Sequence, residues 1–145
     1  MRSLIIFCLI CFCGFSQTVT KVLDGDTIIV DNLTVRILKI DSPEKNQTYG
    51  KESKDYLSRL ILFKKVKVVS SKIDKYGRTL ADVCINGRSV AEIMIESGNA
   101  WHYSYFDSSF ILAQKQITAR KNKLGLWKYK AINPYNFRKN GIYKR

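Results

Sequence analysis

Residues 18–41 consist of short runs of branched apolar residues separated by turn sequences. The runs are 18–23, 27–30 and 33–40, all rich in Val, Ile, Leu and Thr, and Asp31-Asn32 between the last two is typical of a tight turn. Short apolar strands joined by tight turns bury their apolar residues most readily in an antiparallel sheet. The opening of the chain therefore predicts a β-meander.

The rest of the chain adds two strands and three helices. Residues 65–70 and 79–85 have strand patterns, and the second of these ends at Asn86-Gly87, a strong turn signal. Apolar residues recur at helical spacing in 51–63. Five strands without regular alternation of strand and helix favour a small β-barrel of the α+β class, and an OB-fold barrel matches best.

The second and third helices are predicted from their ends. Ser89 and Glu92 have the spacing of a capping box, and Gly98 is placed to end the helix that begins there. The third helix is expected from about Asp107 or Ser108 to about Lys123. Its core face is expected to comprise Phe110, Ala113 and Ile117.

Residues 1–16 have the layout of a secretory signal peptide. Arg2 precedes an apolar run from 4 to 15, and Ser16 follows it. The run is shorter than the ~20 residues of a membrane span. We therefore expect cleavage near Ser16, export to the periplasm or the medium, and no stable membrane insertion afterwards. A lipid anchor at Cys11 or Cys13 is the alternative.

Residues 17–145 are predicted to form one compact, monomeric domain with a basic C-terminal tail. Cys84 is the only cysteine in this range, which excludes an internal disulfide. Residues 108–145 carry ten Lys and Arg and no acidic residue. Such a charge attracts polyanions, although a solvated basic helix and tail is the simpler explanation.

The inventory of side chains limits the possible chemistry. With His102 as the only histidine and Cys84 as the only cysteine of this range, acid–base catalysis by two histidines and a Cys/His zinc site are both excluded. His102 is most simply a structural or surface residue. Any hydrolytic chemistry must rest on carboxylates, arginines and a hard cation.

Two short segments, 24–27 and 36–44, concentrate these groups. The first has two aspartates around a glycine that allows a tight turn, and the second runs from Arg36 to Asp41, Ser42, Pro43 and Glu44. A residue before proline is held extended, so the carbonyl of Ser42 is a further candidate oxygen ligand. Such ligands suit Ca²⁺ and, less readily, Mg²⁺. Either segment alone is an ordinary turn sequence.

Arg36 lies within an otherwise apolar strand. A buried guanidinium is costly unless it meets an anion, so Arg36 is expected to face a phosphate or to form a structural salt bridge. The segment 74–78, which alone would be a polar hairpin, adds Arg78 for bidentate phosphate contact. It also offers Lys75 and Tyr76 for contacts with a nucleic-acid strand.

Three motifs together resemble the staphylococcal nuclease family. They are Asp-Gly-Asp-Thr at 24–27, Arg-x4-Asp-Ser-Pro-Glu at 36–44 and Asp-Lys-Tyr-Gly-Arg at 74–78, in the family's order and at similar intervals. The resemblance runs from about residue 19 to residue 127. It implies a five-stranded OB-fold barrel with three helices, and a Ca²⁺-dependent endonuclease acting on DNA and/or RNA that leaves 3′-phosphate and 5′-hydroxyl ends.

The resemblance also implies roles for individual residues. The metal ligands would be Asp26, Asp41 and the backbone carbonyl of Ser42. The catalytic residues would be Glu44, which activates or orients the attacking water, and Arg36 and Arg78, which contact the scissile phosphate. The supporting residues would be Lys75 and Tyr76, which bind substrate, and Asp24, which would contact the metal ligands rather than the metal itself.

Two departures from the family pattern matter. The segment 44–49 is shorter than the mobile loop of the best-known member, and the aromatic residues of 101–106 are out of step with that member's base-stacking tyrosines. Two alternatives to a nuclease remain. One is a non-catalytic OB-fold module that binds single-stranded nucleic acid, and the other is a cationic exported protein that acts on envelopes or on other proteins.

Overall fold

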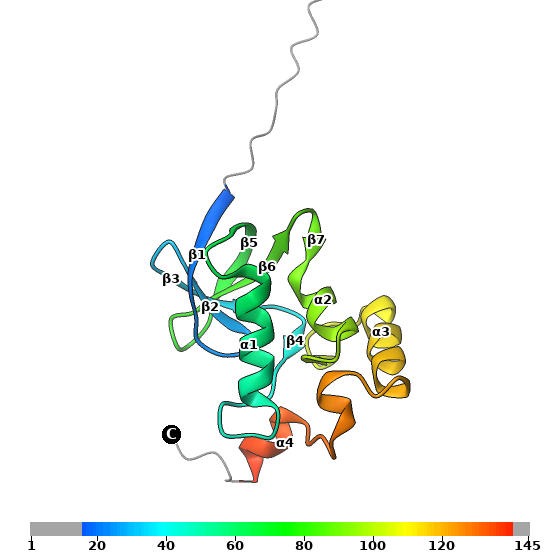
Figure 1. The fold of residues 1–145 in the computed structure, drawn as a ribbon. Coiled ribbons are helices and arrows are strands. Elements are labelled where there is room, and N and C mark those ends of the chain that lie inside the picture. The colour runs from blue at the N-terminus through cyan, green and yellow to red at the C-terminus, as the bar shows by residue number, and fades with distance from the viewer. Residues whose placement is uncertain (1–15, 141–145) are drawn as a thin grey trace, which may run out of the picture.

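The computed structural model describes residues 16–140 and consists of a ring of strands with helices packed around it (Figure 1). The ring contains β1 (Ser16–Val22), β2 (Thr27–Val30), β3 (Leu33–Ile37), β5 (Lys65–Ile73) and β6 (Thr79–Ile85). Neighbours in the order β3-β2-β1-β5-β6 are antiparallel, and a parallel pairing of β3 with β6 joins the two ends. The predicted OB-fold of the α+β class is confirmed. Of the predicted signal segment, 1–16, residues 1–15 lie outside the described residues.

Two predicted turns connect strands as expected. Asp31 and Asn32 have φ values of 44° and 72°, and Asn86 and Gly87 have values of 48° and 77°. Positive φ at both central positions matches the twist of an antiparallel hairpin. The first turn joins β2 to β3, and the second joins β6 to the short strand β7 (Arg88–Ser89).

The expected continuous strand over 33–40 is wrong. β3 ends at Ile37, the chain turns through Lys39 at a φ of 69°, and a new strand, β4 (Ile40–Asp41), pairs with β8 (Trp101–His102). The amide of Leu38 donates to the carbonyl of Ala81 at 2.9 Å, which holds this break in place. The break directs the chain after β3 back across the side chain of Arg36.

Three helices lie where the sequence predicts them. They are α1 (Gly50–Ile61), α2 (Val90–Glu96) and α3 (Phe110–Lys121). The hydroxyl of Ser89 accepts the amide of Glu92 at 3.4 Å, which is the N-cap contact of the predicted capping box, while the Glu92 side chain pairs with Lys115. Gly98 follows α2 with a φ of 72°, the left-handed conformation that glycine adopts without strain.

The buried face of α3 differs from the prediction. Phe110 and Ile117 are 73% and 54% exposed, whereas Leu112 and Ala119 are buried. At about 100° per residue, Phe110 and Ile117 lie on nearly the opposite side of the helix from Leu112. Gln116, on the inner side, accepts the amide of His102 at 2.8 Å, so a polar contact helps to fix the rotation of the helix.

Two further elements follow α3 and were not predicted. They are a 3-10 helix, η1 (Gly125–Lys128), and a short helix, α4 (Pro134–Lys139). In η1, Trp127 packs edge-on against Trp101 with ring centroids 4.4 Å apart. The α4 helix lies below α1, beside the loop that enters α1 (Figure 1). Among residues 16–140, no helix has the length and apolar character needed to cross a membrane.

Candidate active site

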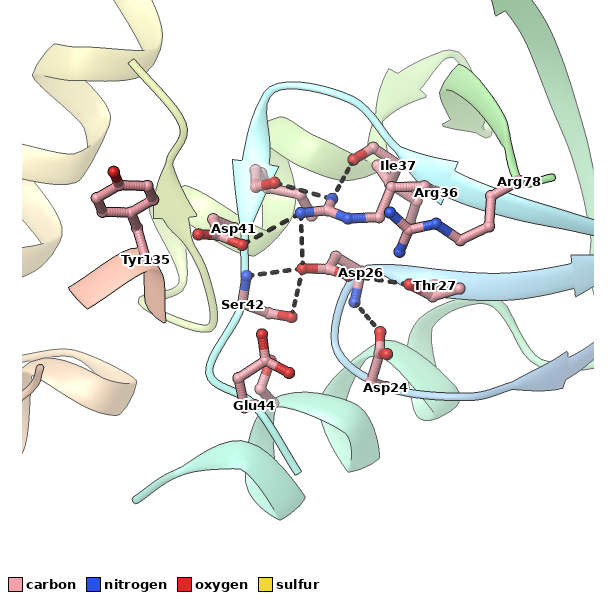
Figure 2. Close-up of polar contacts among 12 residues, drawn as sticks. Asp24, Asp26, Thr27, Arg36, Ile37, Asp41, Ser42, Glu44, Arg78 and Tyr135 are labelled. Atoms are coloured by element: carbon pink, nitrogen blue, oxygen red, sulfur yellow. Dashed lines mark hydrogen bonds and ion pairs between the residues drawn. The ribbon is translucent and has the colours of Figure 1, made fainter. Parts of the chain in front are cut away.

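Asp26 is buried between β1 and β2 and holds the next segment of the site in place (Figure 2). Its Oδ2 accepts both the amide and the hydroxyl of Ser42, each at 2.8 Å. Two segments that are 16 residues apart in the chain are therefore fixed to each other. The hydrogen bonds occupy the Ser42 donors and leave its carbonyl, the predicted ligand atom, outside this contact.

Arg36 joins the two predicted metal carboxylates. Its Nη2 lies 3.1 Å from Asp26 Oδ2 and 3.2 Å from Asp41 Oδ1 (Figure 2). Its Nη1 donates to the carbonyls of Ile37 and Ile40, at 2.6 Å and 2.9 Å. The side chain is only 12% exposed, so the expectation that this guanidinium must meet an anion is confirmed. Because one nitrogen reaches both carboxylates, Asp26 and Asp41 lie together as predicted.

A second guanidinium, that of Arg138 in α4, covers the other side of Asp41. Arg138 contacts both oxygens of Asp41, with Nη1 to Oδ1 at 3.2 Å and Nη2 to Oδ2 at 2.9 Å. Its Nη1 also donates to Glu44 Oε1 at 2.6 Å. Arg138 thus brings Glu44 and Asp41 into one ion-pair network. Sequence reasoning missed this residue because it treated the tail as a run of basic charge.

The pKa values of the aspartates follow from burial and these partners. Burial disfavours the charged form of Asp26, but Arg36 and the two Ser42 hydrogen bonds outweigh it, so its pKa is lowered. Burial raises the pKa of Asp41 despite its contacts with Arg138 and Arg36. Burial and the adjacent charge of Asp26 raise the pKa of Asp24 to about 7. The Oδ1 of Asp24 accepts the amide of Asp26 at 3.1 Å, behind the carboxylates that face Arg36.

The raised pKa of Asp24 predicts a pH-dependent effect of Asp24→Asn, a change that keeps the acceptor oxygen. Below its unfolded pKa, near 3.8, the carboxyl is neutral in both states; as pH rises to about 7, ionisation increasingly favours the unfolded chain. Without divalent cations, the variant should therefore melt at least about 3 °C higher than the wild type at about pH 8, and much less so at about pH 4. Calorimetric melting at both pH values measures this. An equal difference at both would contradict the assignment.

Gly25 is needed for close approach rather than for a left-handed turn. A Cβ atom at Gly25 would lie 2.1 Å from the hydroxyl of Ser53 and 2.7 Å from the Cβ of Ser42. The φ of Gly25 is not positive, so the position does not need glycine for a left-handed turn. It needs glycine because any larger residue would clash with Ser53 and Ser42. The glycine lets the segment that carries Asp26 press against both α1 and Ser42.

The predicted substrate residues lie on the hairpin between β5 and β6. Arg78 pairs with Asp74, with both Nε and Nη2 at 2.8 Å from Asp74 Oδ2. Its side chain extends from the start of β6 toward the carboxylates (Figure 2). The ammonium of Lys75 lies 5.1 Å from the ring centre of Tyr76 at the exposed tip. Arg78 is therefore directed toward the site from its own hairpin, whereas Lys75 and Tyr76 lie at the exposed tip.

His102, Cys84 and the aromatic residues of 101–106 differ in their surroundings. His102 Nε2 lies 2.7 Å from Asp107 Oδ2, and the ring is buried, as expected of a structural histidine. Cys84 is a free thiol. Tyr105 and Phe106 are exposed, whereas Trp101 packs on Trp127.

The donor set suits a hard cation. Asp26 and Asp41 supply carboxylate oxygens in one place, with Ser42 and Glu44 next to them. Residues 16–140 contain no cluster of three or more His, Cys, Asp or Glu side chains arranged to hold a metal. A cation here would therefore need backbone and water oxygens beside the two aspartates, as Ca²⁺ sites often have. The guanidinium of Arg138 now occupies both oxygens of Asp41.

Comparison with known proteins gives a consistent family assignment. Residues 34–129 match the model of the family described as "Staphylococcal nuclease homologue". An uncharacterized endonuclease of Escherichia coli O157:H7 is 40% identical over 114 residues, which cover 75% of this chain and 74% of that protein. A micrococcal nuclease of Shigella flexneri is 34% identical over 130 residues, 78% of this chain and 74% of that protein. A staphylococcal-like nuclease of Arabidopsis thaliana is 36% identical over 117 residues, but the match spans only 36% of its length.

Proposed function

We propose that this chain, which belongs to the staphylococcal nuclease family, is an endonuclease that hydrolyses phosphodiester bonds of nucleic acids. We further propose that it depends on Ca²⁺, acts on DNA and/or RNA, and leaves 3′-phosphate and 5′-hydroxyl ends. Two bacterial relatives named as nucleases, each matched over about three quarters of its length, support the class of reaction.

The observation that carries the proposal is the contact of one Arg36 nitrogen with both Asp26 and Asp41. A nuclease must offset the charge of a phosphodiester and place a water molecule against it. The buried carboxylates provide a place for a cation, and the guanidinium beside them provides a contact for the phosphate. A binding module would need the basic surface but not two buried carboxylates around an arginine.

Each residue then has a definite task. Asp26, Asp41 and the Ser42 carbonyl would hold the cation, which when bound offsets negative charge on the phosphate. Glu44, which is 20% exposed at the mouth of the site, would take a proton from the attacking water or orient it. Arg36 and Arg78 would donate to the phosphate oxygens as their charge grows. Asp24 would support Asp26 through its amide.

Substrate contacts and cellular location complete the proposal. Lys75 and Tyr76, at the exposed hairpin tip, would contact the strand beyond the scissile phosphate. The N-terminal sequence supports export after cleavage near Ser16, and we propose that the exported protein is a monomer. N-terminal sequencing of the protein recovered from the periplasm or medium of a bacterial host should give Gln17 as the first residue.

The experiment incubates the purified protein with labelled single-stranded DNA, RNA and duplex DNA, in Ca²⁺, in Mg²⁺ or in chelator. Internal cleavage that requires Ca²⁺ and leaves 3′-phosphate ends is the expected result. Tight binding without cleavage in any divalent cation would instead favour the binding module. Neither binding nor cleavage would favour a cationic protein with another target.

Arg78→Ala tests the proposed phosphate contact of Arg78, which, unlike Arg36, forms no ion pair with Asp26 or Asp41. Within residues 16–140, Arg78 forms an ion pair with Asp74 on the same hairpin and with no other residue, so the variant should fold with a melting temperature close to that of the wild type. Loss of one strong donor to the phosphate should lower the cleavage rate by at least about a hundredfold. Arg88→Ala, which removes a more exposed arginine that is likewise held in an ion pair, with Glu96, is the control. Equal cleavage rates for the two variants would contradict a role for Arg78 in binding the phosphate.

A further inference from the structure

The C-terminal helix α4 places an arginine where the proposed function needs a cation. We propose that Arg138 is a tethered competitor of the metal ion, and that it sets the Ca²⁺ concentration at which the site fills. The proposal rests on the proposed function, since it assumes that Asp41 is a metal ligand. Arg138 would be a positioning residue, because it acts through Asp41 and Glu44.

The contacts of Arg138 are those that a bound cation would need. Both oxygens of Asp41 accept from its guanidinium, at 3.2 Å and 2.9 Å, and the Asp41 side chain is only 3% exposed. Glu44 Oε1 accepts from it as well, at 2.6 Å. Bidentate pairs between arginine and carboxylate are among the stronger ion pairs in proteins. A cation that approaches Asp41 would therefore have to share or displace oxygens that Arg138 already contacts, next to the charge of the guanidinium.

The tail is docked by contacts that are independent of this ion pair. The Gln47 side chain donates to the carbonyl of Ile132 at 2.6 Å, and the ring of Tyr129 lies 5.9 Å from that of Tyr49. Phe137, next to Arg138, is 5% exposed. Asn133 caps α4 by accepting the amide of Tyr135 at 2.9 Å. These contacts hold the tail against the loop that carries Glu44, so Arg138 is delivered to the site at high effective concentration.

The charges in the site favour competition between Arg138 and a bound cation. In the metal-free site, three carboxylates, those of Asp26, Asp41 and Glu44, meet two guanidinium groups, those of Arg36 and Arg138. A divalent cation at Asp41 would lie beside the positive charge of Arg138 and repel it. When only the fraction of molecules with Asp41 released can bind, the apparent dissociation constant rises by the inverse of that fraction. Removing the guanidinium should therefore tighten cation binding.

The test is calorimetric titration of the full-length protein with Ca²⁺ in the absence of nucleic acid. Arg138→Gln should bind Ca²⁺ at least about tenfold more tightly than the wild type. Lys139→Gln removes the same charge from the adjacent residue of α4 and should change the affinity by less than about twofold. Arg138→Lys, which keeps the charge but not the bidentate geometry, should fall between the wild type and Arg138→Gln.

The outcomes separate this proposal from the proposed function. Unchanged or weaker Ca²⁺ binding by Arg138→Gln, together with Ca²⁺-dependent cleavage by the wild type, would contradict the proposal that Arg138 competes with Ca²⁺. The proposed nuclease function would be unaffected. Equal tightening by Arg138→Gln and Lys139→Gln would also contradict this competition, because general charge would then explain the effect. Absence of Ca²⁺ binding and of Ca²⁺-dependent cleavage in every variant would overturn both.

Discussion

Glu44→Gln is expected to lower the rate of phosphodiester cleavage by at least about a hundredfold while leaving a folded protein. The amide keeps the size of the side chain and an oxygen that can accept from Arg138, but it cannot take a proton from water. The measurement is the initial rate on a labelled oligonucleotide at saturating Ca²⁺, with the melting temperature of the same sample as a check on folding.

The control for Glu44→Gln is Glu52→Gln, the same change at an exposed position in the first turn of α1. The control should cleave at the rate of the wild type. Wild-type rates in purified Glu44→Gln would falsify the role given to this carboxylate.

Arg36→Gln is expected to remove activity and to lower the free energy of unfolding by about 3 kcal/mol in chelator. Its guanidinium is the link between Asp26 and Asp41, and without it two buried carboxylates face each other with less compensation. Urea denaturation of the variant and the wild type measures the loss. Added Ca²⁺ should restore part of it, since the cation replaces the missing positive charge.

Lys51→Gln provides the comparison, because it breaks an exposed ion pair with Asp55 on α1. Exposed pairs contribute roughly 0–1 kcal/mol, so this variant should remain close to the wild type. If Arg36→Gln were no less stable than Lys51→Gln, the pairing of Arg36 with both aspartates would not describe the protein in solution.

Much of the fold follows from local sequence. Strands β2 and β6 have the predicted bounds, because each is a run of apolar residues that ends at a turn sequence. The Asp31-Asn32 and Asn86-Gly87 turns and the cap at Ser89 depend on residues that are neighbours in the chain. Local chemistry of this kind is visible without a structure.

The errors arise where distant segments decide the outcome. The break at Lys39 depends on a hydrogen bond from Leu38 to β6 and on pairing with β8, neither of which leaves a signal in 33–40. The rotation of α3 depends on a polar contact with His102 as well as on apolar spacing, and Phe110 and Ile117 offered an equally regular stripe. Tertiary contacts override local pattern in both cases.

The site shows the same division. The pairing of Asp26 with Asp41 through Arg36 could be anticipated, because an arginine in an apolar strand needs an anion. Arg138 could not, since 94 residues separate it from Glu44. One local signal was present: Asn133-Pro134 is a typical start of a helix, which would have given the tail a structure to carry its arginine.

The most direct test of the central claim measures the cleavage rate against free Ca²⁺ for the wild type and for Asp41→Asn. The wild type should show no cleavage in chelator and a saturable rise with Ca²⁺. Asp41→Asn should show either no cleavage or a curve shifted to much higher Ca²⁺, because it removes a charged oxygen ligand. Cleavage by the wild type that persists in chelator, or an identical curve for Asp41→Asn, would contradict a cation-dependent nuclease site at Asp26 and Asp41.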